Sequence, residues 1–432
     1  MRGKKLGFIA LIAIVVGSQI GSGMFVLPSD LAQYGVSGLL GWAVSITGAI
    51  CLALVFSDLS AHLPRSGGPH VYVSEAFGKV AGFYMAWVYW DVSWLSNSVL
   101  LVTVIKYLTV ITGDLSTIAV LSVEMAVIAI VVIANVMGLR FSGFIETFLI
   151  CLKTVPLIIL PIAFLTVFDP THFKLKPPEL TSYSNLISTL SSTALLTFWC
   201  FIGVECGTTT AGSIRNPAKT LPRAITIGTI VVSVIYMLNI ISVVGVMGFD
   251  SLMNTPAPYS LVMSKVFGHS SDVVISTLII VVCIGTLNSW TLTSSQTAYG
   301  AYVEGLFPKI FGKVNKFDAP IVALLISAIG IIPFLLYEQL EQGGLDKLIN
   351  LIVSIFLYVY LGCCAAYFKL VKRWYARNVD VLKKRTLACI SGAVCTFVLL
   401  QDIMISFVVL AIFVVLGWPV YLRCKRQRKE EA

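Results

Sequence analysis

Charged residues are scarce in this 432-residue sequence: they make up 12% of the chain, whereas a soluble domain carries about 25%. Histidine is scarce too, and the four residues present all fall in expected loops, which argues against a metal cluster or a histidine proton relay. None of the ten cysteines lies in a long outer loop, so no disulfide framework is expected. The apolar residues, 57% of the chain, therefore decide the class of protein.

Apolar runs long enough to cross a bilayer recur along the whole chain. About 20 apolar residues span the hydrocarbon core, so the sequence predicts an all-α integral membrane protein formed by a single domain over residues 1–432. The first run is too long for a signal peptide and has no small-residue cleavage site before it. The twelve expected spans are 7–33, 37–57, 81–110, 116–138, 143–167, 187–213, 224–248, 272–303, 320–337, 347–368, 386–402 and 403–422.

The basic residues predict how these spans are oriented. With the N-terminus inside, 24 basic residues fall in inner loops, four fall outside and two lie within spans, which accounts for all 30. This bias follows the positive-inside rule, so the formal net charge of +9 needs no nucleic-acid partner. No expected outer loop carries an Asn-x-Ser/Thr acceptor. We therefore expect a multi-pass protein of a bacterial inner (plasma) membrane with both termini cytoplasmic.

Two of the spans are interrupted at corresponding places. Span one contains GSQIGSG (17–23), and span six contains FWCFIGVECGTTTAG (198–212). Each glycine costs a helix interior about 1 kcal/mol against alanine, and freed backbone groups at membrane depth are tolerated only where they line a cavity. Matching interruptions in two halves indicate a transporter binding site. A helix-packing role for Gly17-x-x-x-Gly21 is the alternative.

Ionisable side chains within the spans are the next candidates. Glu205 follows the span-six break, and a mid-span carboxylate is costly enough to indicate function by default. We expect it either to accept a proton or to cap backbone N–H groups of the broken helix. Lys153 lies too deep in span five to reach the interface and is expected to face protein.

Aromatic residues lie at the same depth as the breaks. Trp199 precedes the break in span six, and Trp290 lies in span eight; aromatic faces attract cations at about 0.5–2 kcal/mol each. Tyr89, Ser93 and Asn97 recur every four residues, so we expect them on one face of span three. Simple packing is the alternative for each tryptophan.

Three segments resemble a known family. They are GSQIGSGMF (17–25), FWCFIGVECGTTTAGSIRNPAKTLPRAI (198–225) and SWTLTSSQTAYGAYVEGLFPKIFGKVNKFDAP (289–320). Together they resemble the amino acid–polyamine–organocation superfamily, in particular its bacterial basic amino acid/polyamine antiporters. The resemblance implies a leucine-transporter-like fold, with inverted repeats at 7–167 and 187–368 and two extra spans at 386–422.

The resemblance also implies roles by position. The expected substrate-binding residues are Ile20, Gly21, Ser22 and Gly23 around the carboxylate, Ser18, Ser93 and Asn97 beside the substrate, and Trp199, Ile202 and Trp290 around its cation. Tyr89 would belong to an inner gate around Glu205, which would couple proton movement to transport. No metal and no cofactor is implied.

The function that this resemblance implies is exchange of a cationic amino acid for its decarboxylated amine, of the arginine/agmatine, ornithine/putrescine or lysine/cadaverine type. Two departures leave specificity and coupling open. The arginine/agmatine exchangers have an asparagine in place of Ser18 and an apolar residue in place of Lys153, where proton-coupled relatives carry a lysine. The alternative is therefore a proton-coupled amino acid symporter, with Lys153 as the proton site.

Other classes of membrane protein fit the sequence poorly. An enzyme would need a nucleophile–base pair or a histidine cluster at a common depth, and a channel would need rings of like charge or a filter repeat. The expected partners are the small-molecule substrate, protons and the lipid bilayer, with a homodimer left open.

Overall fold

The computed structural model describes residues 7–65, 67–137, 139–173, 183–209, 211, 214–253, 255–268, 270–341, 345–375 and 377–431. Several basic residues used to orient the spans lie outside this set: Arg2, Lys4, Lys5, Lys174 and Lys176. Within it, regular structure is helical apart from one isolated bridge between Val314 and Pro320.

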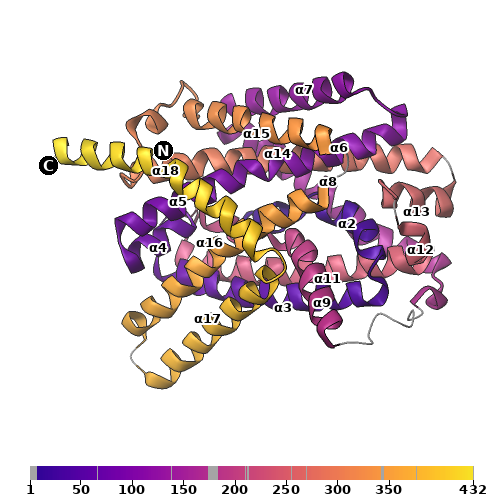
Figure 1. Cartoon of the computed structure of the whole chain (residues 1–432), viewed down its shortest axis with the longest axis horizontal. Helices are drawn as coiled ribbons and strands as arrows, with labels where there is room; N and C mark the ends of the chain where they lie inside the picture. The colour runs from indigo at the N-terminus through magenta and orange to yellow at the C-terminus, as the bar shows by residue number, and fades with distance from the viewer. Residues whose placement is uncertain are drawn as a thin grey trace.

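The described chain forms a bundle of helices, most of them long, with a few short helices between them (Figure 1). They are α1 (Phe8–Gln19), α2 (Gly23–Ala32), α3 (Gly35–His62), α4 (Pro69–Phe77), α5 (Lys79–Leu95), α6 (Asn97–Thr112), α7 (Thr117–Val136), α8 (Leu139–Phe164), α9 (Tyr183–Phe198), α10 (Cys206–Thr209), α11 (Pro217–Met247), α12 (Phe249–Leu252), α13 (Pro258–Phe267), α14 (Ser270–Val303), α15 (Ile321–Glu341), α16 (Leu345–Trp374), α17 (Asn378–Leu399) and α18 (Ile403–Glu431). Short 3-10 turns are η1 (Leu165–Val167), η2 (Pro170–Phe173), η3 (Trp199–Phe201) and η5 (Lys309–Gly312).

Eleven helical stretches in the described part of the chain are long and apolar enough to cross a membrane. They cover every expected span except 386–402, which lies in α17. That helix begins earlier than expected, and its first turns carry Asp380, Lys383, Lys384 and Arg385. It still packs against α16, α3 and α9. The all-helical membrane fold of about twelve spans is therefore confirmed.

The broken segments lie in the middle of the bundle. Helix α1 packs against α8, α11 and the short α10, while α2 packs against α3, α11 and α13. Most of α2 is buried. On the outside, α18 exposes a row of large apolar side chains, including Met404, Phe407 and Val415. Interrupted helices inside the bundle and apolar side chains on its outer surface are what a lipid environment requires.

Span three shows an irregularity that the sequence analysis did not predict. It divides into α5 and α6 at Ser96. The hydroxyls of Ser93, Ser96 and Ser98 each donate to a carbonyl three or four residues earlier. Such back-bonding bends helices. The four-residue spacing from Tyr89 therefore does not continue as one regular face to Asn97.

Candidate functional site

The break in span one separates α1 from α2 at Ile20, Gly21 and Ser22, as predicted. A break removes N–H donors from the carbonyls before it, and side chains of three other helices supply new ones. These hydrogen bonds run from Lys153 Nζ to Gly17 O (2.5 Å), from Tyr236 Oη to Gln19 O (2.7 Å) and from Thr286 Oγ1 to Ile20 O (3.0 Å). Side-chain donors from α8, α11 and α14 therefore satisfy the freed carbonyls. The surrounding helices thus stabilise the break.

The break in span six lies directly beside it. Helix α9 ends at Phe198, η3 follows, and the chain turns before α10 begins at Cys206. Gly203 has φ +107°, a conformation that favours glycine, and a Cβ there would lie 3.0 Å from the carbonyl oxygen of Ser18. Ser18 Oγ in turn donates to Gly203 O at 3.1 Å. The C-terminal end of α1 thus lies directly against the break in span six.

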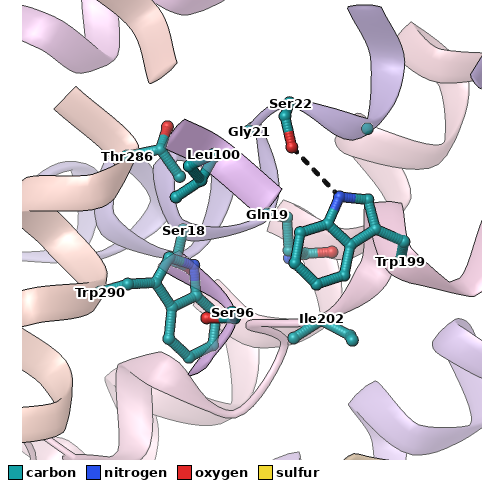
Figure 2. Close-up of a pocket in the computed structure, with 11 residues that line it drawn as sticks. Ser18, Gln19, Gly21, Ser22, Ser96, Leu100, Trp199, Ile202, Thr286 and Trp290 are labelled. Atoms are coloured by element: carbon teal, nitrogen blue, oxygen red, sulfur yellow. Dashed lines mark hydrogen bonds between the residues drawn. The ribbon is translucent and has the colours of Figure 1, made fainter. Parts of the chain in front are cut away.

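A narrow pocket opens between the two breaks, with an empty volume of about 320 Å³. Figure 2 shows the indoles of Trp199 and Trp290 on opposite sides of it. Trp199 Nε1 donates to Ser22 Oγ at 3.3 Å. The residues that line the pocket are Ser18, Gln19, Gly21, Ser22, Gly23, Ser96, Leu100, Trp199, Ile202, Thr286 and Trp290.

Seven of the ten expected substrate-binding residues line this pocket, and Ile20, Ser93 and Asn97 do not. Ile20 is buried beside it, Ser93 bonds its own helix, and Asn97 Nδ2 donates to Thr291 Oγ1 at 3.3 Å. Asn97 also lines a second, smaller cavity together with residues of α7, α14 and α15. On span three the pocket wall is made instead by Ser96 and Leu100, which lie one helical turn apart.

The structure brings Tyr89 and Glu205 together. Tyr89 Oη donates to Glu205 Oε1 at 3.1 Å, and Tyr360 Oη donates to Glu205 Oε2 at 2.6 Å. Glu205 is fully buried. Its two oxygens therefore tie α5 and α16 to the turn before α10.

An aromatic cluster connects this carboxylate to the pocket. The Phe356 ring packs edge-on against Trp290, with centroids 5.6 Å apart, and against Tyr89 at 6.1 Å. Tyr360 lies one turn further along α16 and packs on Phe356 at 6.2 Å. Sequence analysis missed both α16 residues, although their four-residue spacing within an apolar span was a signal.

Lys153 is fully buried and links three spans. Besides Gly17 O, its ammonium donates to Thr286 Oγ1 at 3.4 Å. Thr286 lines the pocket and bonds Ile20 O. Lys153 therefore contacts the break directly without being one of the pocket-lining residues.

The comparisons decide the family. A model described as amino acid permease matches residues 6–423, almost the whole chain. The protein belongs to the amino acid permease family. This permease is accordingly a transporter and not an enzyme.

Its relatives are named as transporters or antiporters of amino acids and polyamines. The permease is 27% identical to the putrescine transporter PotE of Escherichia coli K12 over 437 residues, 97% of this chain and 96% of the relative. It is 30% identical to a putative arginine/ornithine antiporter of Bacillus subtilis 168, with 75% of each chain covered. It is also 27% identical to the cadaverine/lysine antiporter of E. coli K12, covering 76% of this chain and 73% of the relative.

Proposed function

We propose that this permease exchanges a cationic amino acid for its decarboxylated amine by alternating access around the two broken helices. The observation that carries the proposal is the pocket itself, where the N-terminus of α2 meets two opposed indoles. The first four N–H groups of a helix have no intrahelical partner and attract anions. Gly23 and its neighbours therefore supply donors for a carboxylate, while Trp199 and Trp290 supply aromatic faces for a cation.

One pocket of this kind accepts both halves of the exchange. An amino acid engages the α2 end and the indoles together. Its decarboxylated amine keeps the cation and loses the carboxylate, so it engages the indoles and leaves the N–H groups of the α2 end to water. The cationic end is the part that the two substrates share.

Glu205 supports the coupling part of the proposal. Its carboxylate holds Tyr89 and Tyr360 on the side of the pocket where Phe356 packs against Trp290. Protonation removes an acceptor from one of these tyrosines. A change of charge at Glu205 would thus loosen the contact between α5, α16 and the span-six break, which is the gating step we assign to it.

A proton-coupled symporter is the second candidate, and the position of Lys153 favours it. The Lys153 ammonium donates to a carbonyl of the broken helix. Its protonation could therefore depend on the conformation of that helix. Loss of its proton would turn the charge-assisted hydrogen bond between α8 and Gly17 O into a weaker, neutral one. Coupling through Lys153 would need no exchange partner.

The membrane assignment follows from the basic residues. We propose a bacterial inner membrane with both termini cytoplasmic, on the 24-to-4 bias of inner over outer basic residues. The inverted repeats 7–167 and 187–368 are proposed on the matching positions of the two breaks. The homodimer stays a prediction.

Counterflow in proteoliposomes tests the function. Vesicles loaded with putrescine, agmatine or cadaverine are given external radiolabelled ornithine, arginine or lysine, with and without a pH gradient. The proposal expects uptake that requires the internal amine or amino acid. Uptake into empty vesicles driven by the pH gradient alone would contradict exchange and support the symporter.

A further inference from the structure

A large groove lies on the surface of the bundle and shares no lining residue with the pocket. It runs between α3, α11 and α17 and has an empty volume of about 1100 Å³. It lies near the C-terminal end of α3 and the N-terminal ends of α11 and α17, the end of the bundle that we assign to the cytoplasm. Its lining residues are Leu54, Ser57, Asp58, Ala61, Pro222, Arg223, Thr226, Ile227, Lys383, Lys384 and Leu387.

The groove carries an excess of positive charge. Three of its residues are basic and one is acidic. Asp58 is already occupied: Lys384 Nζ lies 3.3 Å from it, and the hydroxyls of Tyr367 and Tyr375 donate to it. Arg223 and Lys383 are exposed and pair with no carboxylate in the described part of the chain. Two cations therefore face the groove without a counter-charge.

An apolar track leads away from these cations. Leu54 and Ile227 line the groove and are 39% and 44% exposed. Along α11 the same face continues through Val231, Val234 and Leu238, all exposed, at the three- and four-residue spacing of one helix side. A groove with unpaired cations at one end and an exposed apolar helix face beyond them is complementary to an anionic headgroup that carries a hydrocarbon tail.

We propose that this groove binds one anionic phospholipid of the cytoplasmic leaflet. The phosphate lies between Arg223 and Lys383, within reach of Lys384, and an acyl chain follows the exposed stripe of α11. Basic pockets between spans on this side of a membrane are suited to lipid headgroups. The bound lipid bridges α11 to α17, so it holds the charged N-terminal half of α17 against the bundle.

Native mass spectrometry of the purified permease tests the proposal by titration with phosphatidylglycerol, phosphatidylcholine or glycerol 3-phosphate. The expected result is a first-bound phosphatidylglycerol that is much tighter than phosphatidylcholine, and no competition from glycerol 3-phosphate. In Arg223→Gln/Lys383→Gln that affinity falls about 30-fold, because each basic residue near a membrane surface contributes about fivefold. Two exposed basic residues outside the groove provide the matched control, Lys313→Gln/Lys316→Gln, which keeps the wild-type affinity.

A second variant tests the tail independently of charge. Leu54→Ala/Ile227→Ala keeps all three cations, and we expect it to bind phosphatidylglycerol more weakly than the wild type. Each variant is first checked for a monodisperse peak and wild-type binding of the transported substrate, which separates this proposal from the transport function. Unchanged lipid affinity in the Arg223/Lys383 variant would overturn the proposal. So would equal binding of phosphatidylcholine, or displacement of the lipid by glycerol 3-phosphate.

Discussion

Glu205 is a buried carboxylate held by two tyrosine hydroxyls and by no basic residue in the described part of the chain. A carboxylate in such a place has to be satisfied by hydrogen bonds, and each oxygen accepts one. The proton balance of the site therefore rests on one carboxyl group and two hydroxyls. Substitutions at this residue test coupling without changing the pocket walls.

The Glu205→Gln variant should keep the fold and part of the exchange activity while flattening the dependence of exchange on pH. Glutamine preserves the shape and one acceptor, but it cannot take up a proton. Glu205→Ala should lose most activity because two hydroxyls are left without their acceptor. Exchange rate against pH, at equal protein levels in the membrane, is the measurement. Identical pH profiles for wild type and Glu205→Gln would make Glu205 a structural cap.

At the same scale, Trp199→Leu and Trp290→Leu should each weaken binding of a cationic substrate. Cation–aromatic attraction contributes about 0.5–2 kcal/mol, so a loss of up to about 30-fold in affinity is expected for each. Leucine keeps an apolar wall and removes the aromatic face. Calorimetry or a scintillation proximity assay gives the affinity, and unchanged values in both variants would remove the aromatic pair from the binding mechanism.

At the scale of elements, the break in span one depends on donors from helices that are distant in sequence. Lys153, Tyr236 and Thr286 replace the N–H groups that a continuous helix would have supplied. An unsatisfied buried carbonyl costs about 1–3 kcal/mol. The broken conformation is thus stabilised by its neighbours, and removing one donor should destabilise it measurably.

Lys153→Ala and Thr286→Val separate a structural role from a proton site. Both remove a donor to the broken helix, so both should lower the free energy of unfolding by about 1–3 kcal/mol, but only Lys153 can titrate. Under exchange, both variants should keep amine-dependent uptake at a reduced rate. If Lys153→Ala alone abolishes accumulation driven by a pH gradient, while Thr286→Val retains it, Lys153 is the proton site of a symporter.

His70 gives α4 a pH dependence of its own. It was expected in a loop, but it lies in the first turn of α4, fully buried, and neither ring nitrogen has a hydrogen-bond partner among the described residues. Burial lowers the pKa of His70 from 6.5 to about 4. The unfolded chain therefore binds a proton more readily than the folded one. The stability contributed by the neutral ring is complete above pH 6.5 and falls as the pH drops towards 4.

His70→Gln should accordingly make the unfolding midpoint less sensitive to pH between about 6.5 and 4. The wild type should lose up to about 3 kcal/mol more than the variant across this interval, at about 1.4 kcal/mol for each pKa unit. Thermal unfolding of both proteins in one detergent, at matched ionic strength, measures the difference. Parallel curves would show that His70 is hydrated in solution.

At the scale of the whole molecule, the pocket is narrow and its side chains are largely buried in this conformation. Ser18, Trp199, Ile202 and Trp290 each expose less than a tenth of their surface. A substrate that binds between these buried side chains should therefore stabilise the entire bundle, because a ligand that binds only the folded protein raises its unfolding free energy by about 2.7 kcal/mol at 100 times its dissociation constant.

Thermal unfolding in the presence of candidate substrates tests this expectation. A cationic amino acid and its decarboxylated amine should both raise the unfolding midpoint, and a neutral amino acid of similar size should not. Trp290→Leu is the control, in which the shift should shrink for both cations. A shift produced equally by neutral amino acids would contradict a cation pocket.

The apolar runs and their glycines determined much of this protein. Run length predicts the spans because a helix must satisfy its own backbone in lipid, and the clusters at 17–23 and 203–207 predict the two breaks because glycine weakens a helix locally. The tryptophans could be chosen as candidates because they lie at the depth of the breaks, and Glu205 because a carboxylate within a span is costly. Each of these inferences needs only neighbouring residues.

The family resemblance implied the meeting of Tyr89 and Glu205, but only the tertiary structure decided the other contacts of the site. Tyr360 and Phe356 reach Glu205 and Trp290 from a helix more than 60 residues away in sequence, and Thr286 and Tyr236 reach the freed carbonyls from α14 and α11. The irregularity at Ser96 placed Ser96 and Leu100 in the pocket wall in place of Ser93 and Asn97. Helix periodicity fixes a face only while the helix is regular, and which faces pack together is set by the whole bundle rather than by any one span.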